Sequence, residues 1–327
     1  MRIIKKVGNI KAKQLNFKNP YKIPTYSNTT GDNSFILGLI SGIRNAGKST
    51  LALNFIELEK EHLLKGSSKV YFISPTKDSK VEYFIDKYPD HFQYVDELTK
   101  SNLEEVLAEM KSRVEDWKDR SEGYDVLKKY LNNPNSVSLD EIQLLESMNY
   151  YQDDEIEEFN PDHPPISTLI LDDSVGVPMI CEARSRDGRW FQKFVLKHRH
   201  FPYYCNVFIL TQAIKQICKY FRTNCNWTVL FPFRDFNVLK GVFDEYSALF
   251  NNDVNNFLKL MDDIRARNDH SFCSIYYDKI QYIRLGWNEE VTFTKDEKDI
   301  AGKSHIQKNL IVDKSVKQIT DKKEIKK

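Results

Sequence analysis

The nine residues GIRNAGKST, at positions 42–50, have the types and the spacing that could hold a phosphate group. They fit the P-loop, or Walker A, pattern of a glycine, any four residues, and then glycine, lysine and serine or threonine. The two glycines let the backbone aim N–H groups at an anion, and a helix that begins near Lys48 adds its positive end. We therefore expect a nucleotide-phosphate site formed by Gly42, Arg44, Asn45, Ala46, Gly47, Lys48, Ser49 and Thr50.

The side chains of this stretch predict distinct contacts along a bound nucleotide. Lys48 would reach the β- and γ-phosphates, the Ser49 hydroxyl would bind Mg²⁺, and Thr50 would contact the α-phosphate. Arg44 either adds a phosphate contact or faces solvent. The predicted cofactors are ATP and Mg²⁺, and the alternative is a surface turn that binds no ligand.

Two adjacent carboxylates, Asp172 and Asp173, end the apolar run TLIL at 168–171. The Mg²⁺ of a P-loop site is held by an aspartate at the end of a neighbouring strand, and we expect Asp172 to fill this role. Asp173 would then be the base that orients and deprotonates an attacking water, a pairing that suits hydrolysis better than phosphate transfer to another molecule. The alternative is an acidic turn that caps the next helix.

A polar amide, Gln212, ends a second apolar run, VFILT at 207–211. At the end of a neighbouring strand, its side chain could hydrogen-bond the γ-phosphate or the attacking water and report cleavage to the rest of the domain. The alternative is an amide whose hydrogen bonds are all made within the protein.

Apolar runs and helical patterns alternate along the chain and predict the elements that position these residues. Strands are expected at 34–42, 69–75, 91–95, 166–173, 205–212, 227–233, 271–277 and 280–285. Helices are expected after the P-loop and after Gln212, and at 103–131, 189–199, 235–248 and 253–267. The runs at 166–173 and 205–212 are typical of central parallel strands, because they are apolar throughout. We predict an α/β P-loop NTPase fold with a doubly wound, mainly parallel sheet of the additional-strand type, flanked by helices.

Charge is unevenly distributed along the 327 residues, although the net charge is only +1. Residues 1–22 carry seven basic and no acidic side chains, residues 303–327 carry eight lysines and three acids, and residues 96–165 carry 19 acids and seven basic groups. We expect a basic arm at 1–30 and one ATPase domain at 31–302 with an acidic, helical and irregular insertion at about 96–165. A basic, disordered tail is expected at 303–327.

Two further features limit the class of protein. No apolar run approaches the ~20 residues that span a bilayer, and the basic first residues lack the apolar stretch of a secretory signal. We therefore expect no transmembrane segment and a location inside a cell. The five cysteines form no Cys-x-x-Cys pair, which predicts reduced, mostly buried thiols rather than disulfides or a zinc site.

Taken in order, the P-loop, the strand that ends in Asp172 and Asp173, and the run VFILTQ resemble the FtsK/HerA superfamily. Within it, the sequence is most similar to the genome-packaging ATPases of large DNA viruses, virophages and Polinton-type elements. Most of this resemblance lies in LKHRHFPYYCNVFILTQAIKQICKYFRTNCNWTVLF, and the whole of it covers about residues 35–285. Two features depart from the family: GIRNA is bulkier than the usual loop, and the acidic insertion matches no family motif.

This resemblance implies an ATP-driven translocase of double-stranded DNA, bound without sequence preference, that packages a viral genome into a preformed capsid. It implies a homo-oligomer, with a hexamer expected, that docks on capsid protein or a virion membrane component in the host cytoplasm, a viral factory or the virion. It also implies an arginine supplied in trans to the neighbouring subunit's ATP. The first candidates are Arg222 and Arg199, and the others are Arg184, Arg186 and Arg189.

Other classes of P-loop protein have motifs of their own. The chain lacks the Asn-Lys-x-Asp motif that reads guanine and the Leu-Ser-Gly-Gly-Gln motif of ABC ATPases. A nucleotide or small-molecule kinase stays open, because CEARSRDGRW at 181–190 could form a lid that carries arginines. A non-hydrolysing structural protein that keeps a P-loop is the second alternative.

Overall fold

The structure is a computed structural model that describes residue 26 and residues 35–147, 160–174, 176–267, 270–277, 281–287 and 289–291. The chain divides into two compact units, residues 1–291 and 292–327, and every described residue belongs to the first. The predicted tail at 303–327 and, apart from Tyr26, the predicted arm at 1–30 lie outside the described residues.

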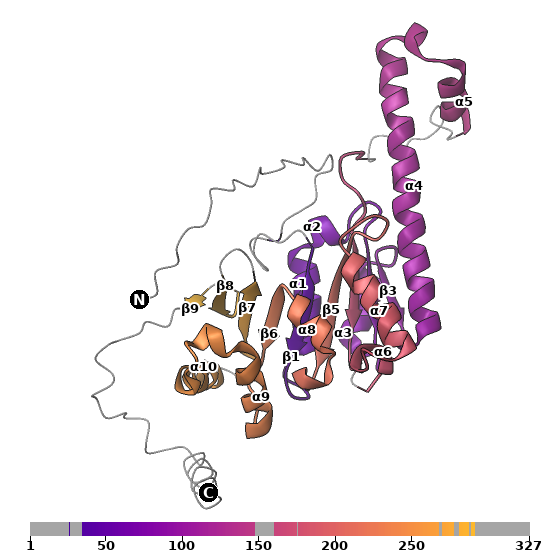
Figure 1. The fold of residues 1–327 in the computed structure, drawn as a ribbon. Helices are drawn as coiled ribbons and strands as arrows, with labels where there is room; N and C mark the ends of the chain where they lie inside the picture. Colours follow the sequence, from indigo (N-terminus) through magenta and orange to yellow (C-terminus); the bar gives the residue numbers. More distant parts are fainter. Residues whose placement is uncertain are drawn as a thin grey trace, which may run out of the picture. The chain divides into compact units, whose positions relative to one another are not determined.

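A nine-stranded sheet forms the centre of the described unit, in the order β3-β2-β4-β5-β1-β6-β7-β8-β9 (Figure 1). The six strands from β3 to β6 run parallel, and β7, β8 and β9 add antiparallel pairs at one edge. The predicted α/β fold with a mainly parallel sheet is therefore confirmed. The strands are β1 Leu37–Ser41, β2 Lys69–Ile73, β3 Phe92–Val95, β4 Ser167–Leu171, β5 Cys205–Thr211, β6 Trp227–Leu230, β7 Cys273–Tyr277, β8 Gln281–Leu285 and β9 Glu289–Val291.

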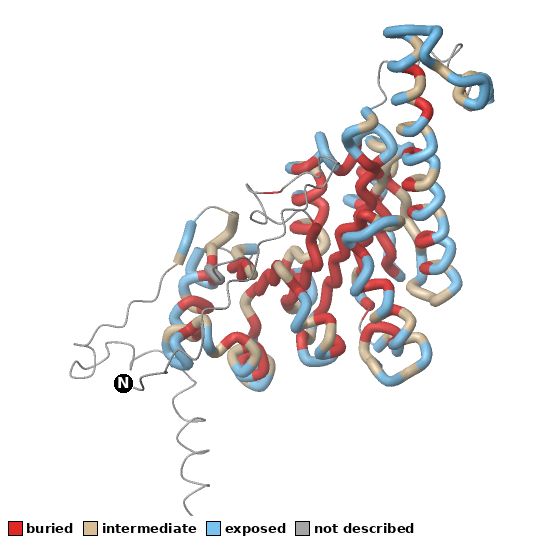
Figure 2. Tube along the Cα trace, turned by 45° about the horizontal axis from the view of Figure 1, so that its top comes forward, coloured by how far each residue is buried: buried red, intermediate tan, exposed pale blue. Residues whose placement is uncertain are grey.

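The central strands are buried on both faces, as their apolar composition predicts. Every residue of β1, β4 and β5 is buried, and Figure 2 shows them in the continuous buried centre of the fold. Each run predicted as a strand contains one, whereas β9 was not predicted because its sequence, EEV, offers little apolar pattern.

Helices cover both faces of this sheet. Successive strand residues point to opposite faces. In β2, Phe72 lies on the face covered by α3, where it stacks on Phe92, which in turn contacts Phe84. Tyr71 points the other way, toward Glu109 of α4. The α-helices are α1 Lys48–Leu58, α2 Lys60–Leu63, α3 Ser79–Lys87, α4 Lys100–Asn132, α5 Leu139–Ser147, α6 Pro178–Cys181, α7 Arg186–Lys197, α8 Lys219–Asn224, α9 Phe236–Tyr246 and α10 Val254–Arg267, with 3-10 turns at η1 Pro134–Ser136, η3 Ile214–Gln216 and η4 Ser247–Phe250.

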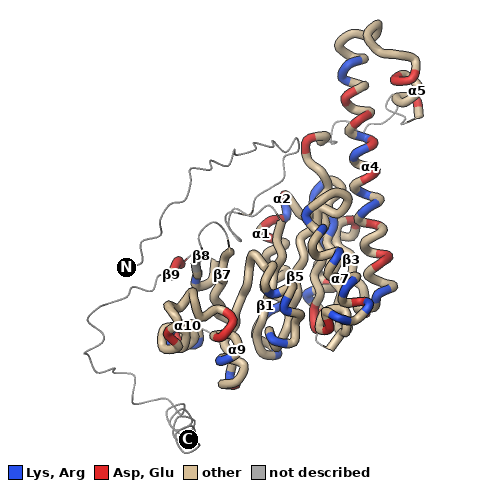
Figure 3. The backbone as a smooth tube through the Cα atoms, in the orientation of Figure 1, with Lys and Arg blue, Asp and Glu red and all other residues tan. Residues whose placement is uncertain are grey.

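The acidic region is built on α4, a helix of 33 residues and therefore ~50 Å in length. Its first half packs on the sheet, and its second half extends beyond it (Figures 1 and 2). Acidic and basic residues alternate along its surface (Figure 3), with i,i+4 ion pairs at Lys111–Glu115 and Lys118–Glu122. The residues predicted to form its apolar face are all buried: Leu103, Val106, Leu107, Met110 and Val114.

A short helix, α5, follows where the sequence predicted irregular structure. The Ser138 hydroxyl accepts from Glu141 N, and the Glu141 carboxylate accepts from Ser138 N at 2.7 Å, which forms a capping box. Leu145 of α5 is fully buried against Leu127 of α4. The spacing of Ser138 and Glu141 fits a capping box and could have predicted the start of this helix. The helix was not predicted because the surrounding residues are strongly acidic.

Candidate functional site

The carboxyl ends of three parallel strands bring together residues that are far apart in the chain. β5 lies between β4 and β1, so the loops that follow these strands meet at one edge of the sheet. The P-loop follows Ser41 of β1, the acid pair follows Leu171 of β4, and Gln212 follows Thr211 of β5. Gly42 N donates to Thr211 O at 3.1 Å, which ties the start of the P-loop to β5.

The P-loop turns sharply and leaves the first turn of α1 open to an acceptor. Asn45 and Gly47 have φ values of 64° and 104°, in the left-handed region. Gly47 is the N-cap of α1 and supplies no side-chain acceptor, so the N–H groups of the first turn are free to bind an anion. Ala46 is buried in the loop, whereas Arg44 and Asn45 are exposed.

Ser49 and Asp172 join the P-loop to the end of β4. The Ser49 hydroxyl donates to Asp172 Oδ2 at 2.5 Å, and Asp172 Oδ1 accepts from Asp173 N at 2.9 Å. Burial raises the pKa of Asp172, against the opposing effects of the Ser49 hydrogen bond and the Lys48 charge. A hydroxyl and a carboxylate oxygen at this spacing form a donor set that suits Mg²⁺, which prefers oxygen ligands and retains several waters.

Lys48 lies within the same group of charges. Its ammonium donates to Ile43 O at 3.1 Å, so it is held inside the loop. Burial lowers the pKa of Lys48, and the negative charges of Asp172 and Asp173 oppose this effect. The positive charge of Lys48 therefore interacts with both carboxylates of the acid pair.

Asp173 and Gln212 form the outer part of the site. Both side chains are exposed, and Gln212 Nε2 donates to Asp173 Oδ1 at 3.4 Å. Asp173 has a φ of 50°, so the backbone turns there directly after β4. The predicted base and the predicted sensor are thus neighbours, brought together by the pairing of β4 with β5.

Two residues that the motif analysis did not single out also contact the P-loop. Lys80, in the first turn of α3, donates from Nζ to Thr50 Oγ1 at 2.6 Å. His270 Nδ1 donates to Ala46 O at 3.3 Å from the segment before β7. Neither residue belongs to a recognisable motif. Lys80 follows shortly after β2, which ends at the same edge of the sheet, and this position was the only sequence feature that could have predicted its contact with the P-loop.

The arginine candidates differ in accessibility. Arg222 Nε donates to Ile217 O at 3.0 Å, and its guanidinium also pairs with Glu245, which leaves only 11% of the side chain exposed. Arg222 is therefore the least accessible candidate, because its donors serve its own chain. The other candidates are exposed, and in the described part of the chain none of them has an ion pair with an acid: Arg184, Arg186, Arg189 and Arg199.

The segment suggested as a kinase lid is part of a folded helical turn. Ser185 caps α7 by accepting from Gly188 N at 2.9 Å and donates to Glu182 O at 2.8 Å. A Cβ on Gly188 would lie 1.9 Å from Glu182 O, so the close packing of α6 against α7 needs glycine there. These contacts hold the segment between two helices.

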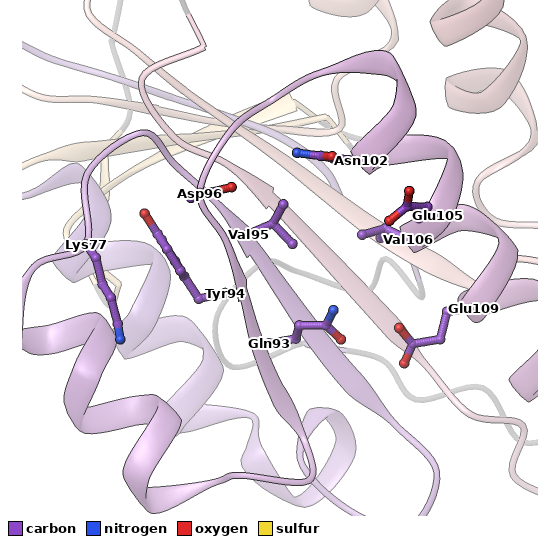
Figure 4. A pocket seen from close by; sticks show the side chains of 9 residues that line it. All are labelled: Lys77, Gln93, Tyr94, Val95, Asp96, Asn102, Glu105, Val106 and Glu109. Carbon is purple, nitrogen blue, oxygen red and sulfur yellow. The ribbon is translucent and has the colours of Figure 1, made fainter.

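An open pocket of about 560 Å³ lies away from the P-loop (Figure 4). It lies between β3, the edge strand of the sheet, and the first turns of α4, and none of the predicted site residues line it. Its walls are polar and carry three acids, Asp96, Glu105 and Glu109, of which Glu109 is paired with Lys69 at 2.6 Å. This pocket is therefore separate from the phosphate site.

Three further observations concern metals, thiols and membranes. Among the described residues there is no cluster of three or more His, Cys, Asp or Glu side chains that could hold a metal ion. Four of the five cysteines are buried and all are free thiols, as the sequence predicted. Within the described ranges, no helix combines the length and the apolar character that crossing a membrane requires.

No family model and no curated protein matches this chain. Solved structures with a similar fold include the genome packaging NTPase B204 from Sulfolobus turreted icosahedral virus 2 in complex with ATP-gammaS, at 13% identity and a TM-score of 0.43, covering 77% of this chain and 96% of that one. The cytoplasmic domain of the type VII secretion ATPase EccC from Thermomonospora curvata has 11% identity and a TM-score of 0.39, over 80% of this chain and 26% of that one. The pCW3 conjugation coupling protein TcpA, with ATPgS, has 13% identity and a TM-score of 0.38, over 78% and 62%.

The similarity of these structures to this chain is one of fold.

Proposed function

We propose that this chain is a P-loop ATPase that binds MgATP at the edge of its sheet and couples hydrolysis to movement of double-stranded DNA. The observation that carries the proposal is the contact between Ser49 and Asp172, 2.5 Å apart, which joins the uncapped first turn of α1 to a strand-end carboxylate. If this turn bound no ligand, its structure would not require the free N-terminus of α1, the half-buried Lys48 and the pair Asp172 and Asp173 to lie together at one edge of the sheet.

Each residue of the proposed site has a distinct role. The free N–H groups of the P-loop and Lys48 would bind the β- and γ-phosphates, and Ser49 and Asp172 would hold Mg²⁺, which would offset charge on the phosphates. Asp173 would accept the proton of the attacking water, with Gln212 holding the same water or the γ-phosphate. The carboxylate and the amide are neighbours, 3.4 Å apart, so both lie within reach of the same water.

The finer part of the proposal is that the protein is a homo-oligomer, with a hexamer expected, that packages a viral genome into a preformed capsid. It depends on the motif resemblance, and docking on a capsid or virion membrane component would follow from it. An exposed arginine from the neighbouring subunit would complete the site. Arg199 and the three arginines at or just before the start of α7, Arg184, Arg186 and Arg189, have the exposure that this needs. Basic residues at 193–200 are candidates for contact with DNA phosphates.

The experiment is steady-state ATP hydrolysis by the full chain with and without long double-stranded DNA. We expect DNA to stimulate turnover, and the stimulation to fall steeply with salt because phosphate contacts release counterions. Lys48→Ala and Asp173→Asn should each reduce turnover by about 100-fold or more, whereas only Lys48→Ala should also abolish MgATP binding. Lys60→Ala, at an exposed lysine of α2 that pairs with Glu57, is the matched control and should leave turnover unchanged.

Other outcomes would point to the alternatives. Turnover that is indifferent to DNA but rises with a small phosphate acceptor would replace the motor with a kinase. Absence of turnover in every oligomeric state, with MgATP binding intact, would favour a structural protein that retains the P-loop. A large reduction of turnover in Asp173→Asn with an unchanged oligomeric state would separate a catalytic effect from an assembly effect.

A further inference from the structure

Among the residues that the structure describes, one lysine beside the P-loop has no acidic partner. In the described part of the chain, Lys80 makes no ion pair, and its ammonium donates to Thr50 Oγ1 at 2.6 Å. Its position is well defined by the start of α3, because Asp78 Oδ1 accepts from both Lys80 N and Val81 N at 3.0 Å. A capped helix thus holds a cation against the first turn of α1.

The lysine at the other end of the same helix is used differently. Lys87 pairs with Glu57 at 3.2 Å and lies over the rings of Tyr83 and Tyr88. Its charge is therefore matched by a carboxylate within the protein. Among the described residues no carboxylate matches the charge of Lys80, so an anion bound beside Thr50 would be its natural partner.

Thr50 lies where such an anion would bind. The first hydrogen bond of α1 runs from Leu51 N to Gly47 O, at 2.8 Å, so Thr50 N is one of the N–H groups that α1 itself leaves free. An oxygen that accepts from Thr50 N or its hydroxyl would also lie within reach of Lys80 Nζ. The three donors together form an anion subsite at the edge of the P-loop.

We propose that Lys80, together with Thr50, binds the α-phosphate of the nucleotide. This inference rests on the proposed function, since it assigns a subsite within the same phosphate site. Lys48 is directed at the β- and γ-phosphates, whereas Lys80 contacts the α-phosphate, which is present in both ATP and ADP. Lys80 therefore stabilises the product complex as much as the substrate complex, and it slows the release of ADP after hydrolysis.

The test is calorimetric titration of the full chain with MgADP and with Mg-ATPγS, for wild type, Lys80→Ala, Lys80→Arg and Lys87→Ala. A lost charge-assisted hydrogen bond corresponds to roughly 10- to 100-fold in affinity. We expect Lys80→Ala to raise the Kd of both nucleotides by a similar factor in this range, and Lys80→Arg to recover most of it. Lys87→Ala, in the same helix, should leave both values within about twofold of wild type.

The outcomes separate this inference from the proposed function. A Lys80→Ala protein that binds MgADP as well as wild type overturns the α-phosphate assignment and leaves the ATPase proposal standing. A loss confined to Mg-ATPγS also overturns it, because the contact would then be to the γ-phosphate. A folded wild-type protein that binds neither nucleotide overturns the proposed function and this inference together.

Discussion

Ser49 and Asp172 are 123 positions apart in the chain, yet their oxygens lie 2.5 Å apart at the centre of the site. From this pair the contacts continue to Asp173, and from Asp173 to Gln212. Each residue therefore acts on its neighbours, and the effects of single substitutions will not add. The outermost member, Gln212, is the easiest to change without disturbing the rest, because it is exposed and makes one long hydrogen bond.

Gln212→Ala should slow hydrolysis and leave nucleotide binding nearly intact. It removes a hydrogen bond of about 1 kcal/mol to the water or the γ-phosphate, which corresponds to roughly fivefold in rate or more. The measurement is a comparison of kcat with the Kd for Mg-ATPγS. Gln216→Ala, an exposed glutamine four positions along the same loop, is the control and should change neither value. An equal loss of binding and turnover in Gln212→Ala would contradict the sensor role.

At the scale of elements, α7 and β5 are joined by a buried histidine. His198, at the end of α7, donates from Nδ1 to Cys205 O at 2.5 Å, and the residue is only 6% exposed. Burial lowers the pKa of His198 to about 4, the hydrogen bond to Cys205 opposes this, and the nearby charges of Arg199 and His200 lower it further. His198 is therefore neutral in the folded protein across the physiological pH range.

This histidine predicts a loss of stability in acid. The unfolded chain binds a proton at His198 as the pH falls below about 6.5, whereas the folded chain does so only near pH 4, so the contribution is complete above pH 6.5 and is lost between 6.5 and 4. The difference amounts to roughly 3 kcal/mol of unfolding free energy. Urea unfolding of wild type across this pH range should show the decline, and His198→Asn, which keeps a donor for Cys205 O, should flatten it. The exposed His200→Asn should not, and equal slopes in all three proteins would contradict this assignment.

The far end of α4 forms a second, smaller packing unit with α5. In the described part of the chain, the buried hydrophobic residues of this unit are Leu127 and Leu145, with three partly buried neighbours, Tyr124, Val126 and Tyr130. This cluster is separate from the main core, so α5 can open while the sheet stays folded.

Leu145→Ala should therefore open α5 locally. Truncating a fully buried leucine costs about 2–5 kcal/mol where it packs, which exceeds what so small a cluster can supply. Hydrogen exchange at residues 139–147 should speed up strongly, while exchange in β4 and β5 and the global melting temperature stay near the wild-type values. Leu139→Ala, at a leucine that is 78% exposed, is the control. A large fall in the global melting temperature would show that α5 and the sheet unfold as one unit.

At the scale of the whole described unit, the core of the sheet supports the site, which lies at one edge of the sheet. Aromatic rings bridge the strands beneath the P-loop: Phe55 of α1 contacts Phe208 and Trp227, and Trp227 stacks on Trp287 at 5.7 Å. Gly42 packs so closely that a Cβ there would lie 2.6 Å from Phe231 Cβ. The P-loop therefore rests on the core, and a ligand bound to it should stabilise the fold as a whole.

MgATP should raise the melting temperature of the full chain. A ligand at 100 times its Kd adds about 2.7 kcal/mol to the unfolding free energy, which corresponds to a shift of several degrees. Thermal unfolding with Mg-ATPγS measures this shift, and Lys48→Ala should remove it. A shift of the same size in Lys48→Ala would mean that the nucleotide binds elsewhere on the protein.

Much of the fold and the inner site could be predicted from local residue order. Apolar runs mark the central parallel strands β1, β4 and β5, because a strand buried on both faces needs apolar side chains at nearly every position. The P-loop pattern needs only neighbours in the chain, and the acids after β4 are adjacent to each other. Each of these features is formed by residues that are close together in the chain, so the sequence alone is enough to predict it.

The remaining features depend on which segments meet in space. Strand order brings Gln212 beside Asp173, the packing of α3 brings Lys80 to Thr50, and the segment before β7 brings His270 to Ala46. Burial of Arg222 against Glu245 likewise depends on how α8 meets α9. No spacing along the chain encodes these contacts, because each one depends on two elements whose approach is set by the shape of the whole core.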